Sequence, residues 1–255
     1  MAVYLRRLFC SSNMYGVSSD ARHFGISYIS EVRAIIGQVL LGVGMTVVVI
    51  ASFLYVPAIP GFGATGETAR IIVYHVPAAW IAVLAYLMST VHSVAYLVTR
   101  DLSRDRRALV NAELGTVFCL LATITGAVWS RAAWGMYWNW DPRQTSIAVL
   151  LLIYAAYFVL RSALNDADRR ARLSAVYATL AFVTVPFLAF VVPRVFPSLH
   201  PDLGAGGGRA SAMSPEVLVV FLASLICFTG LYLWLQNIGV RLYHLQAMRL
   251  LKRGD

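Results

Sequence analysis

The sequence predicts an all-α integral membrane protein with six transmembrane helices and a tryptophan-rich loop on the outer side of the membrane. The 255 residues are 59% hydrophobic and only 13% charged, whereas a soluble domain is about half apolar and about 25% charged. Six segments are each long and apolar enough to cross a bilayer, which takes about 20 residues. Since only helices and closed barrels satisfy the backbone in lipid, one compact helical bundle is the simplest architecture.

The expected helices cover residues 34–56, 71–98, 109–130, 144–161, 173–193 and 215–238. The second is longer than a bilayer requires, so we expect it to tilt or to extend past the membrane surface. It begins in the sequence YHVPAAW, where Pro77 suits the first turn of a helix. The fourth begins at Asp141, which is followed by proline and then, three residues after Asp141, by glutamine. This capping-box-like pattern predicts that Asp141 is the N-cap of the fourth helix.

Basic residues are distributed unequally between the two ends of these helices. Sixteen of the 21 Lys and Arg residues fall in the N-terminal segment, the loops after the second and fourth helices, and the C-terminal tail. By the positive-inside rule, both termini are then cytoplasmic. We expect a cytoplasmic N-terminal arm at 1–33, a six-helix transmembrane domain at 34–240 and a cytoplasmic tail at 241–255. The net charge of +9 therefore reflects membrane topology rather than nucleic-acid binding.

The first 32 residues are polar and contain several arginines, without the apolar core of a cleaved secretory signal. Their arginine and serine content could imitate an organellar transit peptide. An unstructured or short amphipathic cytoplasmic arm is the expectation.

Residue usage argues against several kinds of function. Lys252 is the one lysine of the chain, so no GxxxxGK[ST] loop exists and the chain has no ATPase of its own. Cys10, Cys119 and Cys227 are too widely separated for a CxxC redox pair, a CxxCH covalent haem site or a zinc site. Glu113 is the main acidic residue within an expected helix, and no chain of acidic groups crosses the membrane, which speaks against a proton pump. With no Ser-His-Asp or HExxH pattern either, we do not expect an enzyme.

Four of the six tryptophans fall between positions 129 and 140, in and around the expected outer loop at 131–143. They could form an aromatic belt at the membrane surface, or a platform for a flat apolar ligand. If the run were helical, Trp134, Trp138 and Asp141 would lie on one face. A belt does not require such a concentration in one loop, which favours the platform.

Two histidines share the outer side with the tryptophans. His75 lies at the start of the second helix, and His200 lies in the loop between the last two helices; the other histidines, at positions 23, 92 and 244, fall on the cytoplasmic half. Haem iron takes histidine as an axial ligand, and arginine binds carboxylates such as the haem propionates in a bidentate way. The pattern predicts a non-covalent bis-histidine haem site, with Arg131 and Arg143 as candidate propionate ligands.

Each component also has a structural interpretation. His75 could be a hydrogen-bonded interfacial residue, His200 an exposed loop residue, and Arg143 an interfacial cation whose charge reaches water. We expect Asp141 to cap the fourth helix whatever else it does.

The segment Trp134-Gly-Met-Tyr-Trp138-Asn-Trp140-Asp141 resembles WGxxWxWD, the tryptophan-rich signature of the haem-handling proteins of cytochrome c maturation. The flanking sequences HVPAAW and WDPRQTS and the loop histidine are also similar. Chain length and six spans point to the haem exporter protein C (CcmC) family, over about residues 34–240. Tyr137 departs from the pattern, since many relatives have tryptophan there.

The resemblance implies a protein of the bacterial inner membrane that binds haem b non-covalently on its periplasmic face. It implies that His75 and His200 are the axial ligands of the haem iron. It also implies that the following aromatic and polar residues contact the haem: Trp129, Arg131, Trp134, Tyr137, Trp138, Trp140, Asp141 and Arg143. The haem would be presented to the periplasmic haem chaperone CcmE, in an assembly with the small membrane protein CcmD and the ABC transporter subunits CcmA and CcmB.

Three alternatives remain open from the sequence. A membrane b-haem oxidoreductase acting on quinone usually needs a second, deeper haem, for which only His92 is available. A haem permease would conduct haem through its own bundle. A haem-free scaffold would use the tryptophans only as a belt.

Overall fold

The computed structural model describes residues 14–59, 66–200 and 214–253, and this part of the chain is helical without any strand. The elements are α1 (Met14–Leu54), η1 (Glu67–Ile71), α2 (Ile72–Thr99), α3 (Leu102–Trp134), α4 (Pro142–Ser162), α5 (Ala167–Pro186), η2 (Phe187–Val191), α6 (Val192–Val195) and α7 (Pro215–Arg253). Six stretches are long and apolar enough to cross a membrane: Val32–Leu54, Glu67–Thr99, Leu102–Trp134, Pro142–Ser162, Ala167–Val195 and Pro215–Gln246. The predicted all-α fold with six membrane-spanning helices is confirmed.

The chain divides into two units, residues 1–44 and residues 45–255. In the first unit, α1 begins at Met14, so the second half of the expected N-terminal arm is helical and runs directly into the first span. Residues 1–13 lie outside the described part of the chain. In the second unit, α7 continues without a break to Arg253, past the expected start of a separate tail at position 241.

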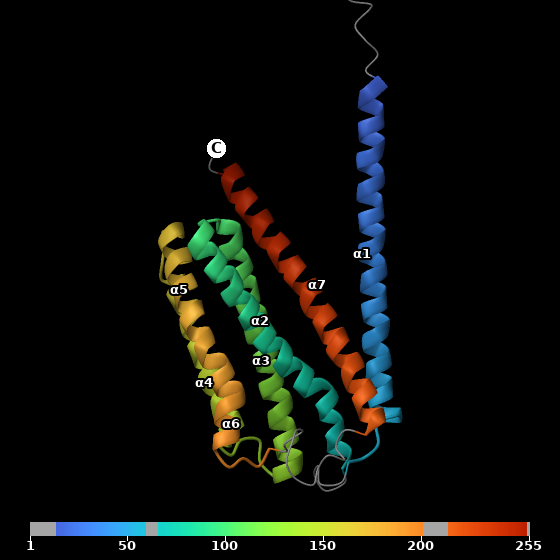
Figure 1. Ribbon diagram of the computed structural model, residues 1–255, viewed down its shortest axis with the longest axis vertical. Coiled ribbons are helices and arrows are strands. Elements are labelled where there is room, and N and C mark those ends of the chain that lie inside the picture. The colour runs from blue at the N-terminus through green and yellow to red at the C-terminus, as the bar shows by residue number, and fades with distance from the viewer. Residues whose placement is uncertain (1–13, 60–65, 201–213, 254–255) are drawn as a thin grey trace, which may run out of the picture. The chain divides into compact units, whose positions relative to one another are not determined.

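Helices α2 and α3 form the centre of the second unit, and α5 and α7 pack against α2 (Figure 1). Small residues permit this close packing. At Gly115 in α3, a Cβ atom would lie 2.6 Å from the Tyr86 ring of α2, so glycine is required for that ring to lie flat on α3. The Tyr86 ring in turn stacks on Tyr154 of α4, with centroids 3.6 Å apart. The three helices are thereby fixed in register around a buried core.

The expected N-cap of the fourth helix is confirmed, because the Asp141 side chain accepts a hydrogen bond of 3.0 Å from the Arg143 backbone N–H. By contrast, the idea of a helical tryptophan run is wrong. Helix α3 ends at Trp134, with Gly135 at a φ of 84° as its C-cap, and residues 135–141 form an irregular loop. Glycine adopts this left-handed conformation without a steric penalty, which explains why the helix stops there.

The fifth span departs from a regular helix near its end. Pro186 lacks the N–H that would continue the helical ladder, and the next residues form the π-helical turn η2 before α6 completes the span. Such turns occur frequently at functional sites. Here the turn carries Leu188, Ala189 and Phe190 into the wall of the cavity described below.

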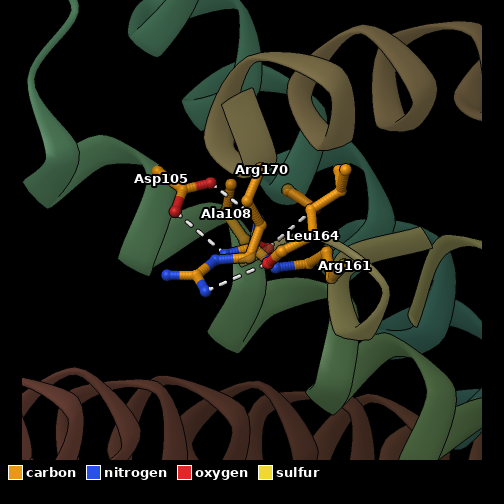
Figure 2. A network of polar contacts seen from close by, with 6 residues as sticks. Asp105, Ala108, Arg161, Leu164 and Arg170 are labelled. Carbon is orange, nitrogen blue, oxygen red and sulfur yellow. Dashed lines mark hydrogen bonds and ion pairs between the residues drawn. The ribbon is translucent and has the colours of Figure 1, made fainter. Parts of the chain in front are cut away.

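At the opposite end of the bundle, a buried ion pair joins α3 and α4 (Figure 2). Both guanidinium NH groups of Arg161 donate to the Asp105 carboxylate, at 2.7 and 2.9 Å, and each side chain is only 10% exposed. The Arg161 guanidinium also lies 5.8 Å from the centre of the Tyr157 ring. Nearby, Arg170 donates to the Leu164 carbonyl oxygen at 3.5 Å. In the sequence, Arg161 is one of the basic residues that indicate orientation, and nothing there predicts its pairing with Asp105.

Candidate functional site

A cavity of about 520 Å³ opens at the end of the second unit where the α3–α4 loop and the segment after α6 lie. Its size falls within the usual range of ligand pockets, about 300–1,000 Å³. The wall is mainly apolar and draws on α2, α3, α4 and the end of the fifth span. A few polar side chains converge on it: His75, Thr123, Asp141, Arg143, Gln144, Ser146, Arg194 and His200.

The two predicted histidines meet in this cavity although they are 125 positions apart in the chain. The ring centroids of His75 and His200 are 6.2 Å apart, and the ring planes differ by 34°. An imidazole nitrogen binds a metal ion at about 2 Å, so two imidazoles on opposite sides of one ion have centroids roughly 6 Å apart. The spacing therefore suits a pair of axial ligands.

The His75 ring lies in a notch on α3. Its Nδ1 is 3.1 Å from the Thr125 hydroxyl oxygen. A Cβ atom on the next residue, Gly126, would lie 2.9 Å from His75 Cε1. Only glycine therefore permits this approach of the ring to the helix. Neither α3 residue was among the sequence-based candidates, because nothing in the local pattern shows which part of α3 faces His75.

The loop that carries His200 is fixed by Asp141. The Asp141 carboxylate accepts hydrogen bonds from the Ser198 hydroxyl, at 2.9 Å to each oxygen, and from the Leu199 backbone N–H at 2.8 Å. The Ser198 hydroxyl oxygen accepts from the backbone N–H of His200 at 3.1 Å. Asp141 is 5% exposed, so these bonds are largely shielded from water. One carboxylate thus caps α4 and holds the His200 segment against it.

The aromatic residues of the signature divide into two groups. Trp129, Trp134 and Trp138 line the cavity, and the rings of Trp129 and Trp134 meet edge to face with centroids 4.9 Å apart. Tyr137 and Trp140 do not line it and are 60% and 74% exposed. Trp140 also has a φ of 60°, which is uncommon for a bulky side chain. The cavity wall gains two aromatic residues that the sequence analysis did not select, Trp80 and Phe190, whose centroids are 5.7 Å apart.

Hydrogen bonds from Gln144 and Ser130 support the irregular loop. The Gln144 side chain accepts from the Asn139 backbone N–H at 2.9 Å, and its amide donates to the Tyr137 carbonyl at 3.4 Å and to Ser130 Oγ at 3.3 Å. Ser130 donates to the Met136 carbonyl at 2.8 Å. The loop backbone is therefore tied to the ends of both α3 and α4.

The structure separates the two arginines that the sequence put forward. Arg143 lines the cavity. Arg131 does not: it donates to the Gly135 carbonyl oxygen, and its guanidinium lies 5.9 Å from the centre of the Tyr137 ring. Arg194 joins Arg143 in the cavity wall, so two cations border a mainly apolar space.

The fold and the site together define a polytopic helical membrane protein with an aromatic cavity at one end, into which two histidines face. A sequence model described as "Heme exporter protein C" matches residues 26–252. The chain belongs to the heme exporter protein C family.

Individual relatives agree with this assignment. The chain is 33% identical to heme exporter protein C of Bradyrhizobium diazoefficiens over 205 residues, which is 80% of this chain and 74% of the relative. It is 26% identical to heme exporter protein C of Haemophilus influenzae over 84% of each chain. It is 28% identical to a putative cytochrome c biosynthesis ccmC-like mitochondrial protein of Marchantia polymorpha, over 78% of this chain and 86% of the relative.

Proposed function

We propose that the cavity binds haem b non-covalently, with His75 and His200 as the axial ligands of the iron. The observation that carries this proposal is the pair of imidazoles, 6.2 Å apart, in the wall of an aromatic cavity. The names of the relatives refer to haem export and cytochrome c biosynthesis. The proposed role is to hold haem for delivery during cytochrome c maturation.

The residues of the cavity fit the chemical requirements of haem. Histidine nitrogens are common axial ligands of haem iron. Trp129, Trp134 and Trp138 supply flat apolar surface for a macrocycle. Arg143 and Arg194 are the cations in the wall that would pair with the two propionates. The Ser146 hydroxyl, which also lines the cavity, is buried and has no hydrogen-bond partner in the described residues, so it can pair with a polar group of a ligand.

The proposal includes a cellular setting. The distribution of basic residues supports an orientation in the bacterial inner membrane with the cavity on the periplasmic face. There it would present haem to a periplasmic haem chaperone of the CcmE type. Since the chain has no P-loop sequence, ATP hydrolysis would come from an ABC transporter formed by CcmA and CcmB, with CcmD as a small membrane partner.

The absorption spectrum of the purified protein, isolated with its partners from haem-replete cells, tests the axial ligands. We expect the Soret and visible bands of a low-spin, six-coordinate haem. His75→Gly and His200→Gly should each abolish the low-spin spectrum, and free imidazole should restore it by occupying the vacated position. His92→Gln is the matched control, because His92 is a buried histidine of the same helix as His75 and lies outside the cavity wall. An unchanged spectrum in either glycine variant would contradict the axial assignment.

A further inference from the structure

The single proton of the Thr125 hydroxyl is committed to the backbone of its own helix. Thr125 Oγ1 lies 2.7 Å from the Leu121 carbonyl oxygen and 3.2 Å from the Ala122 carbonyl oxygen. A threonine hydroxyl carries one hydrogen, and a carbonyl oxygen can only accept. The 2.7 Å contact with the Leu121 carbonyl is the shortest of its polar contacts, and a hydroxyl that donates there offers only its oxygen lone pairs to other groups.

The same oxygen lies 3.1 Å from His75 Nδ1. Two lone pairs cannot form a hydrogen bond, so when the Thr125 proton lies on Leu121, Nδ1 is the nitrogen that carries the ring proton and donates it to Thr125. The His75 ring also forms a hydrogen bond with the Ala122 backbone, which is consistent with a protonated ring nitrogen on this side. A neutral imidazole has one N–H, and its other nitrogen is then an acceptor. Nε2 consequently keeps its lone pair, which is the form in which imidazole binds a metal ion.

We propose that Thr125 is a positioning residue that holds His75 as the Nδ1–H tautomer, so that Nε2 is the atom offered to a metal in the cavity. The ligand role rests on the proposed haem binding, whereas the tautomer is a property of the ligand-free protein. Gly126 completes the arrangement, because the His75 ring approaches the α3 backbone where a Cβ atom would lie 2.9 Å from Cε1 and 3.4 Å from Nδ1. The hydrogen bond fixes the tautomer, and the close approach at Gly126 fixes the ring against α3.

This arrangement affects the ligand strength of His75. An imidazole that donates from its second nitrogen is a more basic ligand, and loss of such a partner typically costs about 10–100-fold in metal affinity. A more basic ligand stabilises the more positive, ferric state of iron. Removal of the Thr125 oxygen should therefore weaken haem binding and raise the midpoint potential of the bound haem.

The tautomer can be measured without haem. Nitrogen NMR of ¹⁵N-histidine-labelled protein in lipid nanodiscs at about pH 8.5, where histidines are neutral, separates protonated from bare ring nitrogens. The His75 signals are identified by their loss in His75→Gln. We expect protonated Nδ1 and bare Nε2 in the wild type and in Thr125→Ser, which retains the hydroxyl, and a substantial Nε2–H population in Thr125→Val.

Thr179→Val is the matched control. Thr179 lies outside the cavity wall and donates to the Ala175 carbonyl oxygen at 2.8 Å within its own helix, α5, so its replacement removes a comparable bond but leaves the partner of His75 in place. The His75 tautomer should not change in this variant. An Nε2–H tautomer in the wild type, or a wild-type tautomer in Thr125→Val, would overturn the proposal.

Haem titration and redox titration supply the second readout. Thr125→Val should bind haem about 10-fold or more weakly and shift its midpoint potential upward, while Thr125→Ser and Thr179→Val remain near wild type. Equal affinity and potential in Thr125→Val and wild type would contradict the ligand-strength part of the inference. If the wild type bound no haem at this cavity, the proposed function would fail, and the NMR result would still decide the tautomer.

Discussion

At the scale of single residues, the two histidines of the cavity are held in place by small neighbouring residues that leave room for them or hydrogen-bond to them. Gly126 leaves room for the His75 ring, and Thr125 accepts its hydrogen bond. Ser198 links the backbone of His200 to the Asp141 carboxylate. None of these residues is conspicuous in the sequence, yet each constrains one of the two histidines.

Gly126→Ala should displace His75. The added methyl group would lie 2.9 Å from His75 Cε1, so the ring must move, and overpacking of this kind costs about 1–3 kcal/mol. We expect a lower thermal-unfolding midpoint and loss of the low-spin haem spectrum. Gly37→Ala is the control, because nothing lies within 4 Å of the new atom and alanine favours the helix. A normal spectrum in Gly126→Ala would show that the notch is not required.

At the scale of secondary-structure elements, the site is built at helix ends and irregular turns. Gly135 ends α3, Asp141 begins α4, and the π-helical turn η2 follows Pro186. These three irregularities bring the Trp138 loop, the Phe190 side chain and the His200 segment around one space. If α3 continued past Gly135, or if the fifth span continued as a regular α-helix past Pro186, these side chains would not meet around the cavity.

Asp141→Ala should cost more than the loss of a helix cap. An N-cap contributes about 1 kcal/mol, and hydrogen bonds to a charged group contribute about 1.5–3 kcal/mol each. Asp166→Ala is the matched control, since Asp166 caps α5 through the Arg169 N–H at 2.7 Å and lies outside the cavity wall. We expect about 1 kcal/mol for Asp166→Ala and about 3 kcal/mol or more for Asp141→Ala by chemical denaturation. Haem loading should fall only in Asp141→Ala, and similar values for the two variants would argue against a link to the His200 segment.

The Asp105–Arg161 pair should behave as a buried ion pair that joins α3 and α4. Removal of one partner leaves an uncompensated buried charge, which costs about 3–5 kcal/mol. Asp105→Leu alone should therefore lower the unfolding midpoint strongly, whereas the double variant Asp105→Leu/Arg161→Met should recover most of the loss. A double variant as unstable as the single variant would indicate that the pair has a role beyond charge compensation.

At the scale of the whole molecule, charge and cavity lie at opposite ends of the second unit. Arg100, Arg104, Arg161 and Arg169 lie in or beside the α2–α3 and α4–α5 connections. At the other end of the second unit lie α6 and the end of α3 (Figure 1), and both contribute residues to the cavity wall. In the proposed orientation, which rests on the positive-inside rule, the arginine-rich end would face the cytoplasm. A ligand of the cavity would then be handled on the outer side.

Reporter fusions test this orientation. Green fluorescent protein at the C-terminus or inserted in the α4–α5 connection should fluoresce, because it folds in the cytoplasm. Alkaline phosphatase fused after Asn139 should be active, because it folds only on the outer side. The reverse pattern of activities would place the cavity in the cytoplasm and would contradict delivery to a periplasmic chaperone.

The helical class, the number of spans and the start of α4 could be predicted from sequence because they follow from local rules, whereas α1, α3 and α7 extend beyond the predicted bounds. Apolar length specifies a membrane span, and a residue such as Asp141 followed by proline specifies a helix start. Alternation of the spans also placed His75 and His200 on the same side, and the structure brings the two rings together.

Only the tertiary structure decided which side chains enter the cavity. Position in the signature does not separate Trp138, which lines the cavity, from Trp140, which does not, because the loop conformation depends on hydrogen bonds from Gln144 and Ser130. Thr125, the partner of His75, lies 50 positions further along the chain, and Asp141, which holds the His200 segment through Ser198, lies 57 positions before Ser198. The sequence by itself determined the six spans and the cap of α4 through local chemistry, whereas the cavity is a product of packing between distant segments, which no local pattern encodes.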